Sequence, residues 1–319
     1  MAAAPAAHAV ITALVDPDGP LVDASALADA ATSLGVTVTA TRVLGPSAVE
    51  LEIVPAAAPS STARDRARAL RADLARVLAE RHPDVACDLA VQLSRPPPRA
   101  PRLLVMDMDS TVISIEVIDE LARRHGVGAE VAAITARAMA GELDFEASLR
   151  ARVARLAGLS ARTLATVAAE LPFTAGVDRL VAAIHALGGW TAIVSGGFDF
   201  AVEAAAAHLR IDHVRANHLC VAHGVLTGEL EGPIVTGHVK AELVTELTAL
   251  HRLQPGCTLA VGDGANDLPM LARADLGVAF HGKPRVAAAA DTAITAGGLD
   301  RVLYLLGLSD ADQAALLDG

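Results

Sequence analysis

The stretch LLVMDMDST, residues 103–111, decides the fold class of this 319-residue chain. Its short apolar run is followed at once by Asp107 and Asp109, a pattern typical of a strand buried on both faces of a parallel sheet. The runs 191–194 and 258–261 have the same character, and each ends in a polar or glycine-rich loop. The sequence therefore predicts a Rossmann-like α/β sheet. In such sheets ligands bind beyond the carboxyl ends of the strands, so we expect these loops to converge on one site.

Two segments around the first core strand predict how the chain is divided. The length and charge of residues 116–171 indicate an inserted helical cap rather than a simple crossover between strands. Residues 95–101, RPPPRAP, contain four prolines, which fit neither a helix interior nor a central strand and predict a semi-rigid linker. We therefore expect an N-terminal domain over residues 1–94 and the α/β domain over residues 102–319.

The N-terminal part shows the βαββαβ order of a ferredoxin-like sandwich. Residues 9–15 predict a strand, residues 22–34 a helix ended by Gly35, and residues 61–82 an arginine-rich amphipathic helix. In the strand over 47–54 and in the last strand, apolar and polar residues alternate, which predicts one buried and one solvent-exposed face. The predicted buried residues are Val49, Leu51 and Ile53, then Val85, Cys87, Leu89, Val91 and Leu93, and the predicted exposed residues are Glu50 and Glu52.

Composition and charge exclude several classes of protein. The net charge of −11, the lack of any Lys/Arg run and the aromatic content of 2% argue against a nucleic-acid partner. The three cysteines, Cys87, Cys220 and Cys257, form no CxxC pair, which argues against a zinc ribbon or disulfide framework and favours a reducing compartment. The sequence shows neither a basic N-terminal region nor a run of about 18 apolar residues, so we expect a cytoplasmic protein with no membrane partner.

The pentapeptide DMDST, residues 107–111, and the loop SGGF, residues 195–198, carry groups suited to phosphoryl transfer. Asp107 can attack phosphorus, while Asp109, if kept protonated, can donate a proton to the leaving oxygen and later accept one from water. The Ser195 hydroxyl and the glycine N–H groups can hold phosphate oxygens. A solvated acidic turn and a tight connection are the alternative interpretations of the two segments.

Lys240 and the loop GDGAND, residues 262–267, add further charged groups. Among 26 basic residues only Lys240 and Lys283 are lysines, which suggests that Lys240 is needed as a compact charge beside a phosphoryl group. A surface lysine is the alternative. Asp263 together with Asp107 could supply the hard oxygen ligands that Mg²⁺ prefers, although the loop could also be an ordinary Gly/Asn turn.

Two other patterns do not lead to a site. GVAFHGK, residues 277–283, fits GxxxxGK, but Pro284 stands where a P-loop needs a Ser or Thr hydroxyl, so nucleotide binding is not expected. Four histidines recur every five residues, which matches neither one helical face nor one strand face, and we interpret them as scattered surface residues rather than zinc ligands. They are His208, His213, His218 and His223.

Together, DMDST, SGGF, Lys240 and GDGAND resemble the four motifs of the haloacid dehalogenase phosphatases. Residues 101–300 are similar to the phosphoserine phosphatases of this family in particular, because of EVIDE at 116–120 and GELDFEASLRARV at 141–153. The resemblance implies Mg²⁺-dependent hydrolysis of O-phospho-L-serine through an aspartyl phosphate, the last step of serine biosynthesis. A phosphotransferase, or a phosphatase for another small amino-alcohol phosphate, is the alternative on the same scaffold.

The resemblance also implies roles for the matching residues. Asp107 would be the nucleophile and a metal ligand, Asp109 the general acid and base and a ligand through its backbone carbonyl, and Asp263 the remaining protein ligand. Asp267 would support the lysine or a metal-bound water from the second layer of the site. The residues implied to bind or position the phosphoryl group are Ser195, Gly196, Lys240 and Asn266.

The predicted cap supplies the residues that would select the substrate. Glu116 and Arg152 would bind the ammonium and the carboxylate of an amino acid, which these side chains complement by charge-assisted hydrogen bonds. An exposed, salt-bridged helix face is the alternative. Phe145 and Met139 could line the apolar side of the pocket, with core packing the preferred interpretation for Met139. The cap is expected to close over the substrate and exclude water.

The N-terminal domain resembles the ACT-type domains that often accompany these phosphatases. Its first loop reads DPDGPL at 16–21, where those domains usually have D-R-P-G, and this departure argues against an amino-acid site there. A dimerisation or structural module is preferred, since lone ferredoxin-like domains commonly pair through sheet edges or helices. We therefore expect a homodimer.

Overall fold

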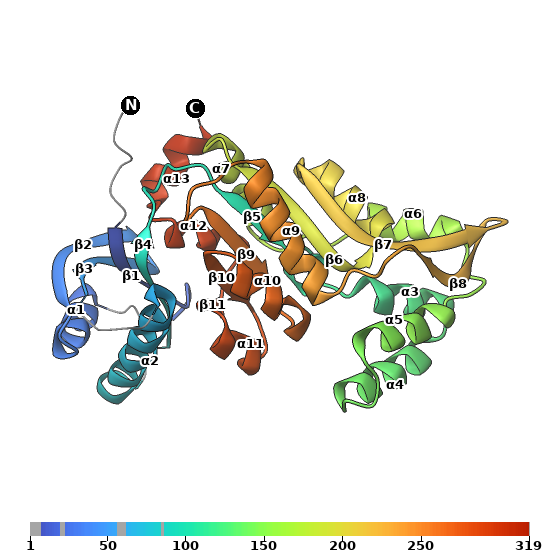
Figure 1. Cartoon of the computed structure of the whole chain (residues 1–319), viewed down its shortest axis with the longest axis horizontal. Helices are drawn as coiled ribbons and strands as arrows, with labels where there is room; N and C mark the ends of the chain where they lie inside the picture. Colours follow the sequence, from blue (N-terminus) through green and yellow to red (C-terminus); the bar gives the residue numbers. More distant parts are fainter. Residues whose placement is uncertain (1–7, 20–22, 56–61, 84–85, 319) are drawn as a thin grey trace.

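The computed structural model describes residues 8–19, 23–55, 62–83 and 86–318, which build two sheets lying next to each other (Figure 1). The first sheet has four strands and the second has seven. Helices α3, α4 and α5 project from the second sheet on the side away from the first sheet (Figure 1). The predicted α/β fold with a helical insertion and a preceding ferredoxin-like unit is confirmed.

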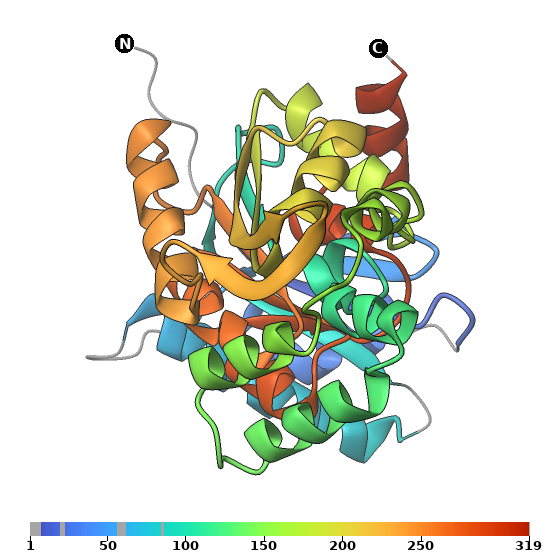
Figure 2. The same cartoon turned by 90° about the vertical axis from the view of Figure 1, so that its right-hand side faces the viewer.

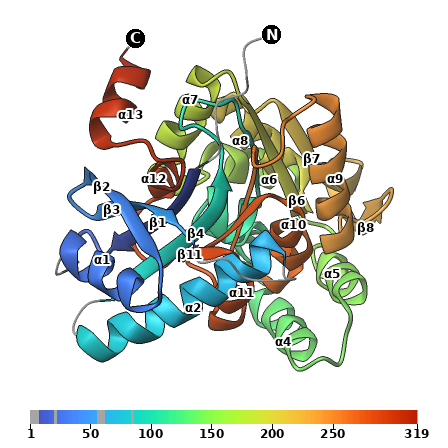
Figure 3. The same ribbon diagram turned by 60° about the vertical axis from the view of Figure 1, so that its left-hand side comes forward.

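The first sheet is antiparallel, with the strand order β2-β3-β1-β4. Its strands are β1 His8–Val15, β2 Thr37–Gly45, β3 Ala48–Val54 and β4 Cys87–Arg95. Helices α1 Ala24–Ser33 and α2 Ala63–Arg81 cover one face of it (Figure 3). The α1 helix begins after Asp23, whose side chain accepts a hydrogen bond from the Ser25 N–H. Positions 22, 61 and 85, which the predicted elements included, lie outside the described residues.

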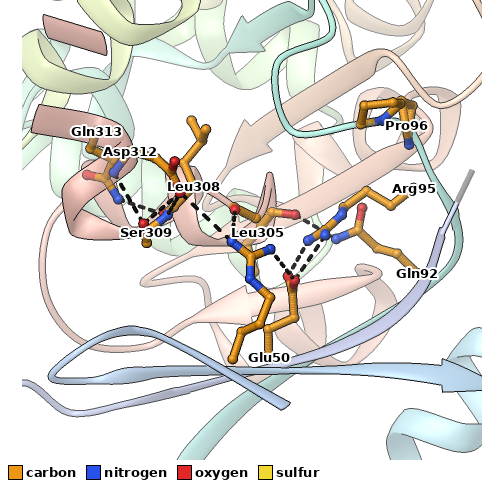
Figure 4. A network of polar contacts seen from close by, with 12 residues as sticks. Glu50, Gln92, Arg95, Pro96, Leu305, Leu308, Ser309, Asp312 and Gln313 are labelled. Carbon is orange, nitrogen blue, oxygen red and sulfur yellow. Dashed lines mark hydrogen bonds and ion pairs between the residues drawn. The ribbon is translucent and has the colours of Figure 1, made fainter. Parts of the chain in front are cut away.

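The prediction that Glu50 faces solvent is wrong. Its side chain has no exposed surface, because the second face of the first sheet is covered by the C-terminal segment of the chain (Figure 4). The Glu50 carboxylate forms ion pairs with Arg95 and with Arg42, whose Nη1 lies 3.2 Å from Oε1. A strand that is covered on both faces loses the contrast between a buried and a wet face, so the alternation of residue types misleads here.

Side chains of the first sheet bind backbone carbonyls of the C-terminal segment. Gln92 donates from Nε2 to the Leu305 oxygen over 2.8 Å, and Arg42 donates from Nη2 to the Gly307 oxygen over 3.5 Å. We call the side chains of Arg42, Glu50, Gln92 and Arg95, with these two carbonyls, the interdomain network (Figure 4).

The proline-rich connection is pinned by a buried arginine. Arg95 belongs to β4 rather than to the connection, and the second sheet begins at Leu103. Arg102 is 1% exposed, and its guanidinium donates to the carbonyl oxygens of Pro96, Pro97 and Ala100 over 2.9 to 3.3 Å. Because buried guanidinium donors need partners, these bonds hold the connection in one path.

The second sheet has the order β11-β10-β9-β5-β6-β7-β8 and is parallel except for β8, which runs antiparallel to β7. Its strands are β5 Leu103–Met106, β6 Trp190–Phe198, β7 His213–Ala222, β8 Val225–Glu231, β9 Thr258–Gly262, β10 Leu276–Phe280 and β11 Thr292–Ile294. The three apolar runs of the sequence are thus the neighbouring central strands β5, β6 and β9, as predicted.

Helices cover both faces of this sheet, so that alternate residues of β5 enter different cores. Leu104 and Met106 pack in the cluster that includes helices α7 and α8, and Leu103 and Val105 pack in the cluster that includes α9, α10 and α11. The helices are α7 Val177–Ala186, α8 Asp199–Leu209, α9 Gly237–Leu250, α10 Leu268–Arg273, α11 Pro284–Ala289, α12 Val302–Leu305 and α13 Asp310–Leu317. Within the described ranges, none of the helices has both the length and the apolar character needed to cross a membrane.

The insertion after β5 is helical, as predicted. It consists of α3 Val117–His125, α4 Gly128–Met139, α5 Phe145–Ala154 and α6 Ala161–Ala169. In Figure 2 most of these green helices lie below the yellow-orange antiparallel pair β7 and β8. The α5 helix packs on β8, and the segment after it is hydrogen-bonded to that strand, with the Gly158 N–H 2.9 Å from the Leu226 oxygen. The edge of the second sheet therefore packs against the cap and supports it.

Candidate active site

The first carboxylate lies directly after the central strand β5. The Asp107 N–H donates to the Val261 oxygen over 2.9 Å, which extends the pairing of β5 with β9 by one residue. The chain then turns through residues 108–112, where Ser110 has the left-handed φ of 56°. A non-glycine residue in this conformation is strained, and such strain is found most often at functional sites.

Lys240 lies beneath the cavity described below and is 1% exposed. Its Nζ is 2.7 Å from Oδ1 of Asp107 and 2.7 Å from Oδ1 of Asp267. Burial lowers the pKa of this ammonium, but the two carboxylates outweigh burial and raise the pKa above its ordinary value. Lys240 is therefore a permanent positive charge beside Asp107, and the surface-lysine alternative is wrong.

Three carboxylates form a cluster that could hold a metal ion. One oxygen each of Asp107, Asp263 and Asp267 lies within 4.8 Å of the others. Burial raises the pKa of Asp263 to about 6, and the charge of Asp267 adds to this effect. Burial and the charge of Asp267 also raise the pKa of Asp107, and the Lys240 ammonium only partly opposes them. The excess negative charge in this buried cluster fits a bound divalent cation, such as one that prefers hard oxygen ligands.

Within this cluster Asp267 differs from the other two carboxylates. It is fully buried, and its two oxygens are occupied by Lys240 and by the Gly264 N–H, which lies 2.9 Å from Oδ2. Asp263 is less buried and is contacted by the Thr111 hydroxyl at 3.4 Å. Asp107 and Asp263 are thus the more accessible carboxylates, and Asp267 is placed to orient the lysine.

Asp109 is held in a state that suits proton transfer. Burial raises its pKa to about 7, and the negative charge of Glu116 adds to this effect. Its Oδ1 accepts a hydrogen bond from the Val117 N–H over 3.2 Å at the start of the cap. A carboxyl group with a pKa near neutrality can both donate and accept a proton during a reaction.

Residues 195–197, near the end of β6, lie close to these carboxylates, and we call them the glycine loop. Ser195 is 1% exposed, and its hydroxyl accepts a hydrogen bond from the Gly197 N–H over 2.8 Å. Space is tight at both glycines: a Cβ on Gly197 would lie 2.7 Å from Oδ2 of Asp109, and a Cβ on Gly196 would lie 2.9 Å from Cζ of Phe145, so a larger residue would displace these side chains. The backbone of this loop can therefore approach a bound group closely.

A cavity of about 190 Å³ joins these elements. It is lined by Asp107, Asp109, Glu116, Ile118, Phe145, Arg152, Ser195, Gly196, Gly197, Asp263 and Asn266. Eight of the ten predicted site residues thus line one cavity, and the remaining two, Lys240 and Asp267, lie behind Asp107. The lining is mainly polar and of both charges, as expected for a small ionic ligand.

The cap contributes one acidic and one basic side chain to this lining, those of Glu116 and Arg152. The Glu116 carboxylate accepts a hydrogen bond from the Ser110 hydroxyl over 2.9 Å. Arg152 is half-buried on α5, and its Nε lies 3.4 Å from the Ser148 oxygen. Burial lowers the pKa of this guanidinium, against the charges of Asp119, Glu116 and Asp109. The guanidinium is partly desolvated, and its only side-chain hydrogen bond in the described structure is long. It can therefore still bind an anionic ligand.

Met139 does not take part in the pocket or the core. Its side chain is 71% exposed at the end of α4, so both interpretations of it are wrong, whereas Phe145 lines the cavity as expected. The segment 277–283 begins within strand β10, which ends at Phe280. The recurring histidines make separate contacts: His218 pairs with Asp199, and His213 with His251 over 2.8 Å. Within the described residues, no histidine belongs to a cluster able to hold a metal ion.

Sequence reasoning missed one buried polar residue near the cavity. Asn217 on β7 is 2% exposed and contacts the backbone of Gly196 and Val235. A buried amide in a strand is a sign of a required hydrogen bond, but this asparagine belongs to no motif.

The chain matches known proteins over the same region. The family model of the haloacid dehalogenase-like hydrolases matches residues 104–272. The chain is 45% identical to a phosphoserine phosphatase of Vibrio cholerae over 68% of this chain and 66% of that protein. It is 46% identical to one of Streptomyces coelicolor over 72% and 56%, and 47% identical to one of Streptococcus thermophilus over 64% and 95%. The first two alignments thus span less than two thirds of the relatives' own length.

Solved structures show the same architecture. A probable phosphoserine phosphatase from Vibrio cholerae, in its unliganded form, superposes with a TM-score of 0.72 and 34% identity, covering 97% of this chain and 89% of that one. A substrate-bound phosphoserine phosphatase complex superposes with a TM-score of 0.60 and 37% identity, covering 64% and 97%.

Proposed function

Since this chain belongs to the haloacid dehalogenase-like hydrolase family, we propose that it is a phosphoserine phosphatase, which hydrolyses O-phospho-L-serine to serine and phosphate. The observation that supports this most is the joint lining of one cavity by the Asp107–Asp109 pair and by Glu116 and Arg152 of the cap. The first pair suits attack on a phosphate ester. The second pair suits an amino acid, and a simple phosphate ester would not need it. The names of the matched relatives agree with this substrate.

The proposed reaction has two steps. In the first, an Asp107 oxygen attacks phosphorus, the bond from phosphorus to the serine oxygen breaks, and Asp109 gives its proton to that oxygen. In the second, Asp109 takes a proton from water, the water oxygen attacks the phospho-aspartate, and the bond to Asp107 breaks to release phosphate. Lys240, Ser195 and the N–H groups of the glycine loop neutralise the charge on the phosphoryl oxygens throughout.

We propose Mg²⁺ as the metal of this site. Asp107, Asp263 and the backbone carbonyl of Asp109 would hold it, which fits the excess of negative charge in the carboxylate cluster. When bound, the ion would stabilise negative charge on the phosphoryl oxygens as a Lewis acid. Asn266, which also lines the cavity, would position the phosphoryl group, and Asp267 would orient Lys240.

Purified protein is expected to release phosphate from L-phosphoserine in a Mg²⁺-dependent manner, and much faster than from a sugar phosphate. The reason is that only the amino acid offers partners to Glu116 and Arg152. Phosphate release is measured with a colorimetric assay beside phosphothreonine and p-nitrophenyl phosphate, with EDTA as the control. Activity on p-nitrophenyl phosphate alone would keep the chemistry and overturn the substrate, and transfer of phosphate to an added alcohol would indicate a phosphotransferase.

Replacing Arg152 by alanine is expected to raise KM for phosphoserine by about 10- to 100-fold, the cost of losing a hydrogen bond to a charged group. The KM for p-nitrophenyl phosphate, which has no carboxylate, should stay nearly unchanged. Arg150→Ala is the matched control, because Arg150 lies on the same helix but pairs with Glu146 at the surface. An equal rise of KM for both substrates in Arg152→Ala would contradict selection of the amino acid by this residue.

For the organisation of the chain, we propose an ACT-like domain over residues 1–94 and a phosphatase domain over 102–319, joined by a linker over 95–101 of which Arg95 is still part of β4. Support comes from the ferredoxin-like order of the first sheet and from β2, whose outer edge pairs with no further strand among the described residues, so that a homodimer could form through it. Light scattering, which measures the molar mass of the protein in solution, tests whether it forms a dimer. The cytoplasmic location stays a prediction.

A further inference from the structure

Asn217 connects two segments that both contribute to the phosphate end of the cavity. Its side chain is 2% exposed, and both ends of the amide are used. The Nδ2 donates to the Gly196 oxygen over 2.8 Å, and the Oδ1 accepts from the Val235 N–H over 2.8 Å. Gly196 belongs to the glycine loop, residues 195–197 near the end of β6, and Val235 precedes α9, the helix that carries Lys240.

The need for such a residue follows from the register of β6 and β7. Val194 pairs with Arg215, but the next pair is Phe198 with Asn217, so residues 195–197 of β6 face a single residue of β7. The loop thus leaves the regular ladder, and the Gly196 carbonyl loses a backbone partner there. The Asn217 side chain supplies that donor, and it lies one pair beyond the irregularity.

The other contact fixes the entry to α9. Val235 is 3% exposed, and its N–H would be buried without a partner if Asn217 were absent. The helix begins two residues later, where Thr236 caps it by accepting from the Val239 N–H. Lys240 lies in the first turns of this helix and reaches Asp107. A shift at Val235 would therefore move the ammonium relative to the nucleophile.

We propose that Asn217 is a positioning residue that holds the glycine loop and the start of α9 at a fixed separation, so that Ser195, Gly196 and Lys240 grip one phosphoryl group together. The inference rests on the proposed function, because it assigns a purpose to the phosphate end of the same cavity. Asn217 itself does not line the cavity, so it acts through the backbone it binds.

The test uses the binding of orthovanadate, a phosphate analogue, to the full-length protein in the presence of Mg²⁺. Asn217→Ala is expected to raise the Kd for orthovanadate at least about tenfold and to lower kcat for p-nitrophenyl phosphate by a similar factor. This factor corresponds to the usual free-energy cost when a buried polar group loses its partner. Asn217→Asp keeps an acceptor for Val235 but offers no donor to Gly196. It is expected to lose affinity as well, and it serves as the second variant if the alanine protein does not fold.

Gln313→Ala is the matched control. Gln313 is 3% exposed, and its amide also makes two hydrogen bonds, to the Leu308 oxygen and from Arg179, far from the cavity. This variant should lower the thermal midpoint while leaving the orthovanadate Kd and kcat unchanged. If both Asn217 variants also lose stability but keep the wild-type Kd and kcat, the residue is purely structural and the inference is overturned.

Failure of this inference and failure of the proposed function give different results. A wild-type protein that binds no orthovanadate and hydrolyses no phosphate ester would overturn both. A wild-type protein that acts on p-nitrophenyl phosphate but not on phosphoserine would overturn the substrate, while the loss of orthovanadate affinity in the Asn217 variants would still support the positioning role.

Discussion

Replacing Asp107 by asparagine is expected to reduce the rate of phosphate release by about 10⁴-fold or more, since loss of a nucleophile removes the covalent route. Asparagine has the same shape but does not attack phosphorus. Phosphate release at saturating L-phosphoserine, with Mg²⁺, measures the effect. Mass spectrometry after acid quenching should detect a phosphorylated wild-type protein and no phosphorylated variant. Full activity of Asp107→Asn would sink the proposed mechanism.

The same variant is not expected to lose stability in the absence of metal. Burial and Asp267 raise the pKa of Asp107, which means that its charged form destabilises the folded state at neutral pH. A neutral amide removes that cost, and Lys240 keeps its ion pair with Asp267. Thermal unfolding in EDTA should therefore give a midpoint no lower than that of the wild type. A much lower midpoint would mean that lost activity reports unfolding.

Replacing Arg95 by alanine is expected to lower the free energy of unfolding by about 3–5 kcal/mol, the usual cost of removing one partner of a buried ion pair. Arg95 is 3% exposed and Glu50 is fully buried, so the remaining carboxylate would keep only the half-exposed Arg42 as its partner. Gly307 packs closely against the Arg95 guanidinium, since a Cβ on Gly307 would lie 2.7 Å from it, so Arg95→Ala would also remove these packing contacts.

Equilibrium unfolding in urea measures this effect. Arg76→Ala is the control, because Arg76 pairs with Asp73 and Glu80 at the surface, where ion pairs contribute only about 0–1 kcal/mol. The double variant with Glu50→Leu and Arg95→Met should recover most of the stability, since apolar side chains of similar volume often replace buried pairs without loss. A single Arg95→Ala variant as stable as Arg76→Ala would contradict the importance of the interdomain network.

The sequence predicted the site better than it predicted the packing around it. Asp107, Ser195 and Asp263 follow apolar runs, and parallel strands bring their carboxyl ends together whatever the rest of the chain does. Lys240 was identified by its rarity as a lysine, and its burial between two carboxylates explains why an arginine would not fit: a point charge is needed there and not a planar fork. Such local chemical requirements can be predicted from the residues alone.

What the sequence could not predict depends on contacts distant along the chain. The alternation around Glu50 is that of a half-exposed strand, yet a segment more than 250 residues away, near Leu305, covers its polar face. Asn217 has no motif because its role follows from a register irregularity in a neighbouring strand. Met139 is apolar and lies within a helical insertion, but only the course of α4 places it outside the core.

The contact between the two sheets also limits how this chain can be engineered. Leu14, Leu44, Ala48 and Ala90 of the first sheet belong to the same buried cluster as the core of the second sheet. A truncated form that starts at Arg102 would expose that apolar surface together with the Leu305 and Gly307 carbonyls. The part of the chain that contains the proposed active site is therefore expected to lose stability without the first sheet. A chimaera with another N-terminal unit would need a matching carboxylate, amide and pair of arginines in that unit.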